Sequence, residues 1–116
     1  MLAKKFRLPI QTFFGPEDKK NTGFIQKRNR YFLLRVKENG LGFGRFGIIV
    51  SSKVSKSAVK RNQIKRIFFD LIRTERIHEK KQKDFLITVL SPASQLGKLE
   101  IKKEIFSLMG EANKND

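Results

Sequence analysis

Two short apolar runs, separated by one helix-length segment, constrain the fold of this chain most. Residues 45–51 and 84–90 are rich in β-branched side chains, which is typical of strands covered on one or both faces. Between them, residues 57–77 carry a helical period. Its apolar side chains fall within one arc of about 100°, at Ile64, Ile67, Phe68 and Leu71. A strand, a helix and a strand in this order predict two strands that can pair in parallel.

The flanking segments add two further elements. Residues 31–36 read as extended, and Asn39-Gly40 is a strong hairpin signal because both residues tolerate positive φ. We therefore expect residues 31–36 and 45–51 to pair as a hairpin. A last amphipathic helix is expected over about residues 98–109, with Gly110 as its C-terminal stop.

These elements predict one α+β domain over residues 1–116, a small mixed β-sheet with the helices packed on one face. Residues 1–23 are expected to be irregular or to hold a short helix, because Gly15-Pro16 breaks regular structure there. Residues 111–116 are expected to form a disordered tail. Ser57 or Ser55 is placed to cap the central helix.

Composition narrows the function. The 116 residues include 26 Lys and Arg against 11 Asp and Glu, so the net charge is +15. The absence of Cys excludes a thiol nucleophile and a Cys-based zinc site, and the single His78 leaves no imidazole cluster. No stretch reaches the roughly 18–20 apolar residues of a membrane span, and the N-terminus does not look like a signal peptide. We expect a cytoplasmic domain that binds a polyanion and neither spans nor binds a membrane.

The positive charge is concentrated before and within the central helix. Between positions 53 and 66 the chain has six basic residues and no acid: Lys53, Lys56, Lys60, Arg61, Lys65 and Arg66. Such a cluster repels itself, and phosphates would neutralise the repulsion. Asn62 within it can pair with a base edge, a 2′-hydroxyl or a phosphate, or else with neighbouring side chains or backbone. A solvated helical face is the competing interpretation of the whole cluster.

The run from Ser51 to Arg66, with Arg-Asn-Gln-Ile-Lys-Arg following a strand and a Ser-Lys turn, resembles the signature of the bacterial ribonuclease P protein subunit. The resemblance implies a left-handed β-α-β crossover, like the second-domain fold of small-subunit ribosomal protein five, although general rules favour the right hand. The chain departs from the family pattern at Ser52, Gln63 and Phe69, where the family usually has basic residues.

The resemblance also implies a function. The protein would bind the catalytic RNA subunit of ribonuclease P and the 5′ leader of precursor tRNA, and would promote removal of the leader in tRNA maturation. The RNA, with bound Mg²⁺, would carry the endonuclease chemistry. The protein itself would bind no cofactor or metal, would not be catalytic alone, and is not expected to bind DNA. The alternative is a ribosomal or other structural RNA-binding protein with no role in cleavage.

Two working surfaces follow from the resemblance. The implied RNA-binding residues are Lys53, Lys56, Lys60, Arg61, Asn62, Lys65, Arg66 and Arg73. The leader would lie in a cleft between the sheet and an N-terminal helix, against Phe13, Phe14 and Phe32. Phe32 and Leu34 share one strand face, so they either line this cleft together or pack in the core together.

The remaining candidates are assigned to structure. Four phenylalanines are expected in the core: Phe46, Phe68, Phe85 and Phe106. Phe24, like Phe13 and Phe14, could stack on a base instead. His78 is expected to be a solvated surface residue, and the glutamates after the central helix are expected to form surface ion pairs. No residue is therefore assigned a catalytic role.

Overall fold

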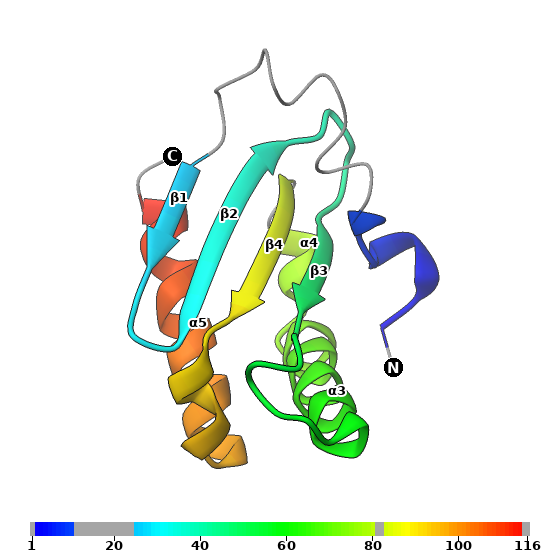
Figure 1. Cartoon of the computed structure of the whole chain (residues 1–116). Coiled ribbons are helices and arrows are strands. Elements are labelled where there is room, and N and C mark those ends of the chain that lie inside the picture. The colour runs from blue at the N-terminus through cyan, green and yellow to red at the C-terminus, as the bar shows by residue number, and fades with distance from the viewer. Residues whose placement is uncertain (1, 11–24, 81–82, 115–116) are drawn as a thin grey trace.

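The computed structural model describes residues 2–10, 25–80 and 83–114 (Figure 1). In chain order the elements are η1 (Lys4–Phe6), β1 (Ile25–Arg28), β2 (Phe32–Glu38), β3 (Arg45–Ile49), α3 (Ala58–Thr74), α4 (Ile77–Lys80), β4 (Lys83–Val89), η2 (Ser91–Gln95) and α5 (Lys98–Lys114). The predicted central and last helices are present as α3 and α5. Within the described residues, no helix is long and apolar enough to cross a membrane.

The strands form one mixed sheet in the order β1-β2-β4-β3. β3 and β4 are parallel, so the predicted parallel pairing is confirmed. The predicted hairpin between residues 31–36 and 45–51 is wrong, because β4 lies between β2 and β3 and pairs with both. The hairpin instead joins β1 and β2, and Asn29 stabilises its turn. Its Oδ1 accepts 2.8 Å hydrogen bonds from the backbone N–H groups of Tyr31 and Phe32.

Asn39-Gly40 does form a turn, but this turn carries the chain across the start of β4. Gly40 adopts a φ of +67°, and Asn39 Oδ1 accepts a 2.8 Å hydrogen bond from the Leu41 N–H. Asn39 Nδ2 donates to Asp84 Oδ1 at 2.9 Å, and Arg45 forks onto the same carboxylate at 2.8 and 2.7 Å. Hydrogen bonding to Asp84 raises the pKa of the Arg45 guanidinium, which therefore stays charged. The buried Asp84 carboxylate thus links the connection between β2 and β3, through Asn39 and Arg45, to β4.

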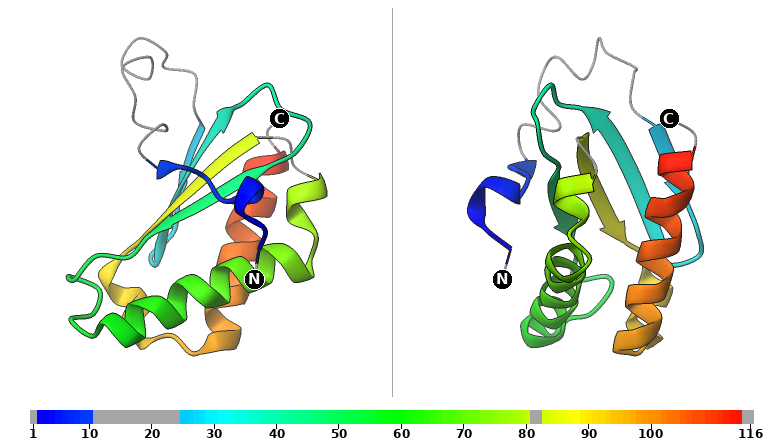
Figure 2. Two further views of the ribbon diagram at one scale, coloured as in Figure 1. Left: turned by 90° about the vertical axis from the view of Figure 1, so that its right-hand side faces the viewer. Right: turned by 180° about the vertical axis from the view of Figure 1, so that it is seen from behind.

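The helices α3 and α5 both cover one face of the sheet, as predicted (Figures 1 and 2). In Figure 1 the helices lie behind the sheet, β3 and β4 both point downward, and β4 is to the left of β3. The connection through α3 is therefore left-handed, which confirms the hand that the resemblance implied against the general preference. Among the described residues, this arrangement leaves the other face of the sheet without an α-helix.

The main core lies between the sheet and the two helices. Its largest fully buried aromatic side chains are Phe32, Phe46, Phe68 and Phe85. The rings of Phe46 and Phe85 stack with centroids 5.0 Å apart, and the predicted core positions of Phe46, Phe68 and Phe85 are confirmed. The prediction for Phe106 is wrong, since its side chain is 51% exposed. α5 directs Ile105 into the core, and the next residue on a helix points about 100° away.

The N-terminal segment packs around the outer edge of β3 (Figure 2). The Leu8 N–H donates to the Phe46 carbonyl at 2.8 Å, and Leu8 packs on Leu86 on the sheet face that has no helix. A Cβ at Gly47 would lie 3.2 Å from Leu8 Cβ and 3.3 Å from an Ile10 carbon. Gly47 therefore permits the close approach of this segment to the sheet.

The prediction that His78 is a solvated residue is also wrong. His78 is 9% exposed, and its ring lies 4.3 Å from the Phe6 ring, which makes an edge contact with Phe43. His78 follows the end of α3 rather than lying on it. The helix stops at Thr74, and Arg76 has a left-handed φ of 53°.

The last helix runs further than the sequence suggests. α5 continues through Gly110 to Lys114, so Gly110 is not a helix stop and residues 111–114 are helical rather than a disordered tail. A single glycine inside a helix costs about 1 kcal/mol relative to alanine, which packing of the helix can outweigh. Residues 115–116 and the Gly15-Pro16 break lie outside the described residues.

Candidate nucleic-acid interface

Serine side chains hold the basic turn, residues 51–57, in place. The Ser51 Oγ accepts from the Lys53 N–H at 3.3 Å, and the Ser55 Oγ accepts from the Ser57 N–H at 3.2 Å. Ser57 then caps α3, because its Oγ accepts from the Lys60 N–H at 3.2 Å. The serines thus satisfy backbone donors in the turn and at the start of α3, and the predicted Ser57 cap is confirmed.

Longer-range contacts fix the same turn to the domain. Val54 is buried in the core. The Ser91 Oγ donates to the Lys53 carbonyl at 3.5 Å, and Arg61 Nη1 donates to the Ser55 carbonyl at 2.8 Å. Arg61, a predicted phosphate ligand, therefore also holds the turn. The backbone of the basic turn is therefore held in a defined conformation, and its lysine side chains project into solvent.

The predicted RNA-binding residues all lie on the basic turn and on α3, and together they are called here the basic surface. Those exposed to solvent are Lys53, Lys56, Asn62, Arg66 and Arg73, and those half-buried are Lys60, Arg61 and Lys65. At 100° per residue, Asn62, Arg66 and Arg73 share the outer face of α3, opposite its buried apolar arc. The structure therefore places Asn62, Arg66 and Arg73 together, whereas Lys60 and Arg61 flank this face on opposite sides.

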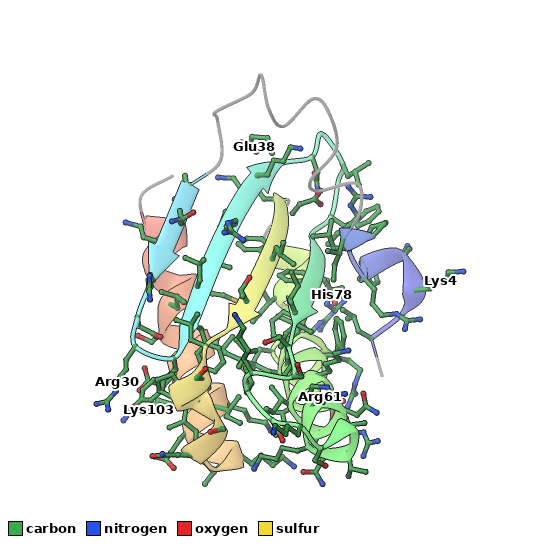
Figure 3. The ribbon with its side chains drawn as sticks, viewed as in Figure 1. Lys4, Arg30, Glu38, Arg61, His78 and Lys103 are labelled. Carbon is green, nitrogen blue, oxygen red and sulfur yellow. The ribbon has the colours of Figure 1, made fainter. Side chains whose placement is uncertain are left out.

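Acidic residues are sparse on this surface. α3 carries five Lys and Arg and one acid, Asp70, whose carboxylate lies 4.0 Å from the Arg73 guanidinium. Glu38 lies at the end of the molecule opposite Arg61 (Figure 3). Arg76 and Glu79, after α3, form a separate exposed pair with two 2.8 Å hydrogen bonds, which raise the pKa of Arg76. Within the part of the chain that the structure describes, the basic surface therefore keeps most of its charge uncompensated.

The sheet face without helices, called here the open face, is the second candidate surface. Its side chains alternate with the core residues along each strand. On β2 it holds Leu33, Arg35 and Lys37, and across the register it holds Thr88 and Leu86 of β4. Leu8 and Ile10 pack beside Leu86 at the β3 edge. The open face thus combines apolar, hydroxyl and cationic groups.

Phe32 does not belong to this surface. Its side chain is 0% exposed and packs in the core beneath α3 and α5, as does Leu34. The prediction that Phe32 contacts the leader is therefore wrong, since no part of the ring is accessible to a base. Phe13, Phe14 and Phe24 lie outside the described residues.

The sequence reasoning missed Leu33, Arg35 and Thr88. The two-residue period that pairs Phe32 with Leu34 also places Leu33 and Arg35 on the opposite face. The sequence therefore contains the signal that places Leu33 and Arg35 on the open face. Among the described residues, no group of three or more His, Asp or Glu side chains is placed to hold a metal ion.

Comparisons with known proteins bear on this geometry. The sequence model of the family described as Ribonuclease P matches residues 23–113. The chain is 32% identical over 106 residues to the ribonuclease P protein component of Desulforamulus reducens, covering 84% of this chain and 92% of that one. It is 30% identical over 108 residues to that of Streptococcus pneumoniae, covering 93% and 85%. The structure of Staphylococcus aureus RNase P protein aligns with a TM-score of 0.79 at 27% identity, covering 92% of this chain and 94% of that one.

The mixed sheet and its helices thus have the fold of an RNase P protein. The chain belongs to the ribonuclease P protein family, as its motif implied. Membership implies a role in tRNA processing and an RNA partner in the holoenzyme.

Proposed function

We propose that this protein is the protein subunit of ribonuclease P and that it binds the catalytic RNA subunit through the basic turn and α3. The observation that supports this proposal most is the fixed backbone of the basic turn. Serine hydrogen bonds and the buried Val54 hold the backbone that carries Lys53 and Lys56, directly before α3. Pre-positioned cations lose little entropy on binding phosphates, and Arg66 can fork two hydrogen bonds onto one phosphate.

The open face then takes the 5′ leader of precursor tRNA. A single strand needs cations for its phosphates and apolar surface for its bases. Arg35 can supply the first, and Leu33 the second. The Thr88 hydroxyl, buried and without a hydrogen-bond partner among the described residues, is a further polar group on the same face. This surface replaces the Phe32 contact that the sequence suggested.

In this proposal the RNA subunit carries the cleavage chemistry, with Mg²⁺ bound through the RNA. The protein contributes binding energy and orientation. It neutralises repulsion between the two RNAs and holds the leader close to the RNA's reacting centre. The expected compartment is the cytoplasm, where the RNA partners are made.

Reconstitution tests the proposal. The refolded protein, freed of RNA, is combined with the transcribed RNA subunit and a precursor tRNA. We expect leader removal by the two components together at physiological Mg²⁺, and none by the protein alone. Cleavage by the RNA-free protein, or association with ribosomal RNA in preference to this subunit, would contradict the proposal.

Salt dependence of binding to the RNA subunit gives a second test. If the basic surface neutralises five to seven phosphates, the slope of log affinity against log salt should be roughly −4 to −6. The measurement is a filter-binding titration over a range of KCl concentrations. A slope near −1 would mean that the basic surface is solvated and does not bind RNA.

A further inference from the structure

A groove of about 360 Å³ lies between α3 and the turn that leads into α5, and it adjoins the basic surface. Its volume is in the range of about 300–1,000 Å³ that is typical of small-molecule sites. Four aliphatic side chains line its apolar part: Ile64, Ile67, Leu96 and Ile101. Ile64 and Ile101 belong to the buried core, so this part of the groove has a rigid floor.

Cations from both sides surround that apolar floor. Lys60 and Arg66 come from α3, and Lys98 comes from the first turn of α5. Lys60 and Arg66 are also part of the basic surface, so a polyanion bound to that surface passes the mouth of the groove. An apolar slot with a cationic rim complements a nucleotide, which joins a flat base to a phosphate.

One carboxamide and one carboxylate also line the groove. Gln63 and Asp70 lie seven residues apart on α3, which places them two turns apart on one side of the helix. The Asp70 carboxylate would repel a phosphate, but it can accept hydrogen bonds from the N–H groups of a base edge. The Gln63 carboxamide both donates and accepts. Gln63 and Asp70 alternate along α3 with Lys60 and Arg66, so hydrogen-bonding groups for a base lie beside cations for a phosphate.

We propose that this groove binds one unpaired nucleotide of the RNA subunit. The base lies on the aliphatic floor with hydrogen bonds to Asp70 and Gln63, and the phosphate lies against Lys60, Arg66 and Lys98. This inference rests on the proposed function, because two of the three cations belong to the surface assigned to the RNA subunit. It adds base recognition to a contact that phosphate neutralisation alone leaves independent of sequence.

Asp70→Asn separates this proposal from simple electrostatics. If the groove does not bind a base, removing a negative charge from a polyanion-binding surface raises affinity. If Asp70 accepts hydrogen bonds from a base, the variant binds the RNA subunit roughly 5- to 10-fold more weakly. The salt slope stays unchanged, since no phosphate contact is lost. Gln63→Ala, at an exposed position, should also weaken binding and serves as the second variant.

Glu75→Gln is the matched control. Glu75 caps the end of the same helix and is exposed, but it lies outside this groove. Its removal should leave affinity for the RNA subunit unchanged or slightly higher. Thermal melting of all three variants shows whether each is folded at the binding temperature. Equal or tighter binding by folded Asp70→Asn, with Gln63→Ala unchanged, would overturn the proposal.

Cross-linking identifies the nucleotide. The chain has no Cys, so Gln63→Cys offers a unique attachment point for a benzophenone probe. We expect cross-links in the holoenzyme to map by primer extension to one unpaired nucleotide of the RNA subunit. Cross-links only to precursor tRNA, or scattered over many sites, would overturn the assignment. Failure of the wild-type protein to bind the RNA subunit would instead refute the proposed function, so the two failures are distinguishable.

Discussion

The two faces of the sheet use neighbouring residues in opposite ways. Phe32 and Leu34 point toward the helices and have no exposed surface, whereas Leu33 and Arg35, one position along, lie half-buried on the open face. Both faces contain apolar side chains, and on the open face cationic side chains lie beside them. The face of the strand on which a residue lies, rather than its type, therefore decides whether its side chain can contact a ligand.

The largest expected effect is on the covered face. Phe32→Ala should lower the free energy of unfolding by about 3–5 kcal/mol, because it removes a fully buried ring and leaves a cavity. Chemical denaturation measures the change. Leu33→Ala is the control at the adjacent position and should cost less than about 1.5 kcal/mol, since its side chain is only partly buried. Similar losses for both variants would contradict the assignment of the two faces.

The second effect concerns the buried Asp84 carboxylate, which links β4 to the connection between β2 and β3. Asp84→Ala should cost about 2–3 kcal/mol, because it leaves the Arg45 guanidinium and the Asn39 amide without their shared partner. The loss should persist at high salt, because the pair is largely shielded from solvent. Urea unfolding with and without 1 M KCl tests both points. A salt-sensitive loss below about 0.5 kcal/mol would show that these hydrogen bonds are exposed to solvent and add little stability.

Smaller effects distinguish two arginines of the basic surface. Arg66→Ala should weaken binding to the RNA subunit by about 1–3 kcal/mol and change stability by less than about 0.5 kcal/mol, because the side chain is exposed. Arg61→Ala should also weaken binding, but with a loss of about 1 kcal/mol in stability, because Arg61 donates to the Ser55 carbonyl. Affinity and melting are measured for both. Unfolding by Arg66→Ala with intact affinity of the folded fraction would make Arg66 structural.

Local patterns predicted the parts of the fold that depend on them. The arc of Ile64, Phe68 and Leu71 predicted the buried side of α3, and Arg66 lies on the opposite side of this helix. The parallel pairing followed from the order of the elements. The basic surface was therefore almost fully predictable, because its residues are close in sequence and its geometry follows from one helix.

Features set by distant contacts were not predictable in the same way. Asn39-Gly40 predicts a turn, but only the insertion of β4 decides that β2 and β3 do not pair. The burial of His78 depends on Phe6, which arrives from the N-terminal segment. The groove beside α3 likewise requires the start of α5, whose position no local period reveals.

Leader preference tests the division of labour between the two surfaces most directly. The measurement compares the affinity of the reconstituted holoenzyme for precursor tRNA with a leader and for the same tRNA without one. The wild-type holoenzyme should prefer the precursor, and Arg35→Ala should lose most of that preference while binding the RNA subunit normally. Arg66→Ala, once saturated with the RNA subunit, should keep the preference. Leader preference that survives Arg35→Ala and disappears in Arg66→Ala would contradict the assignment of the open face to the leader.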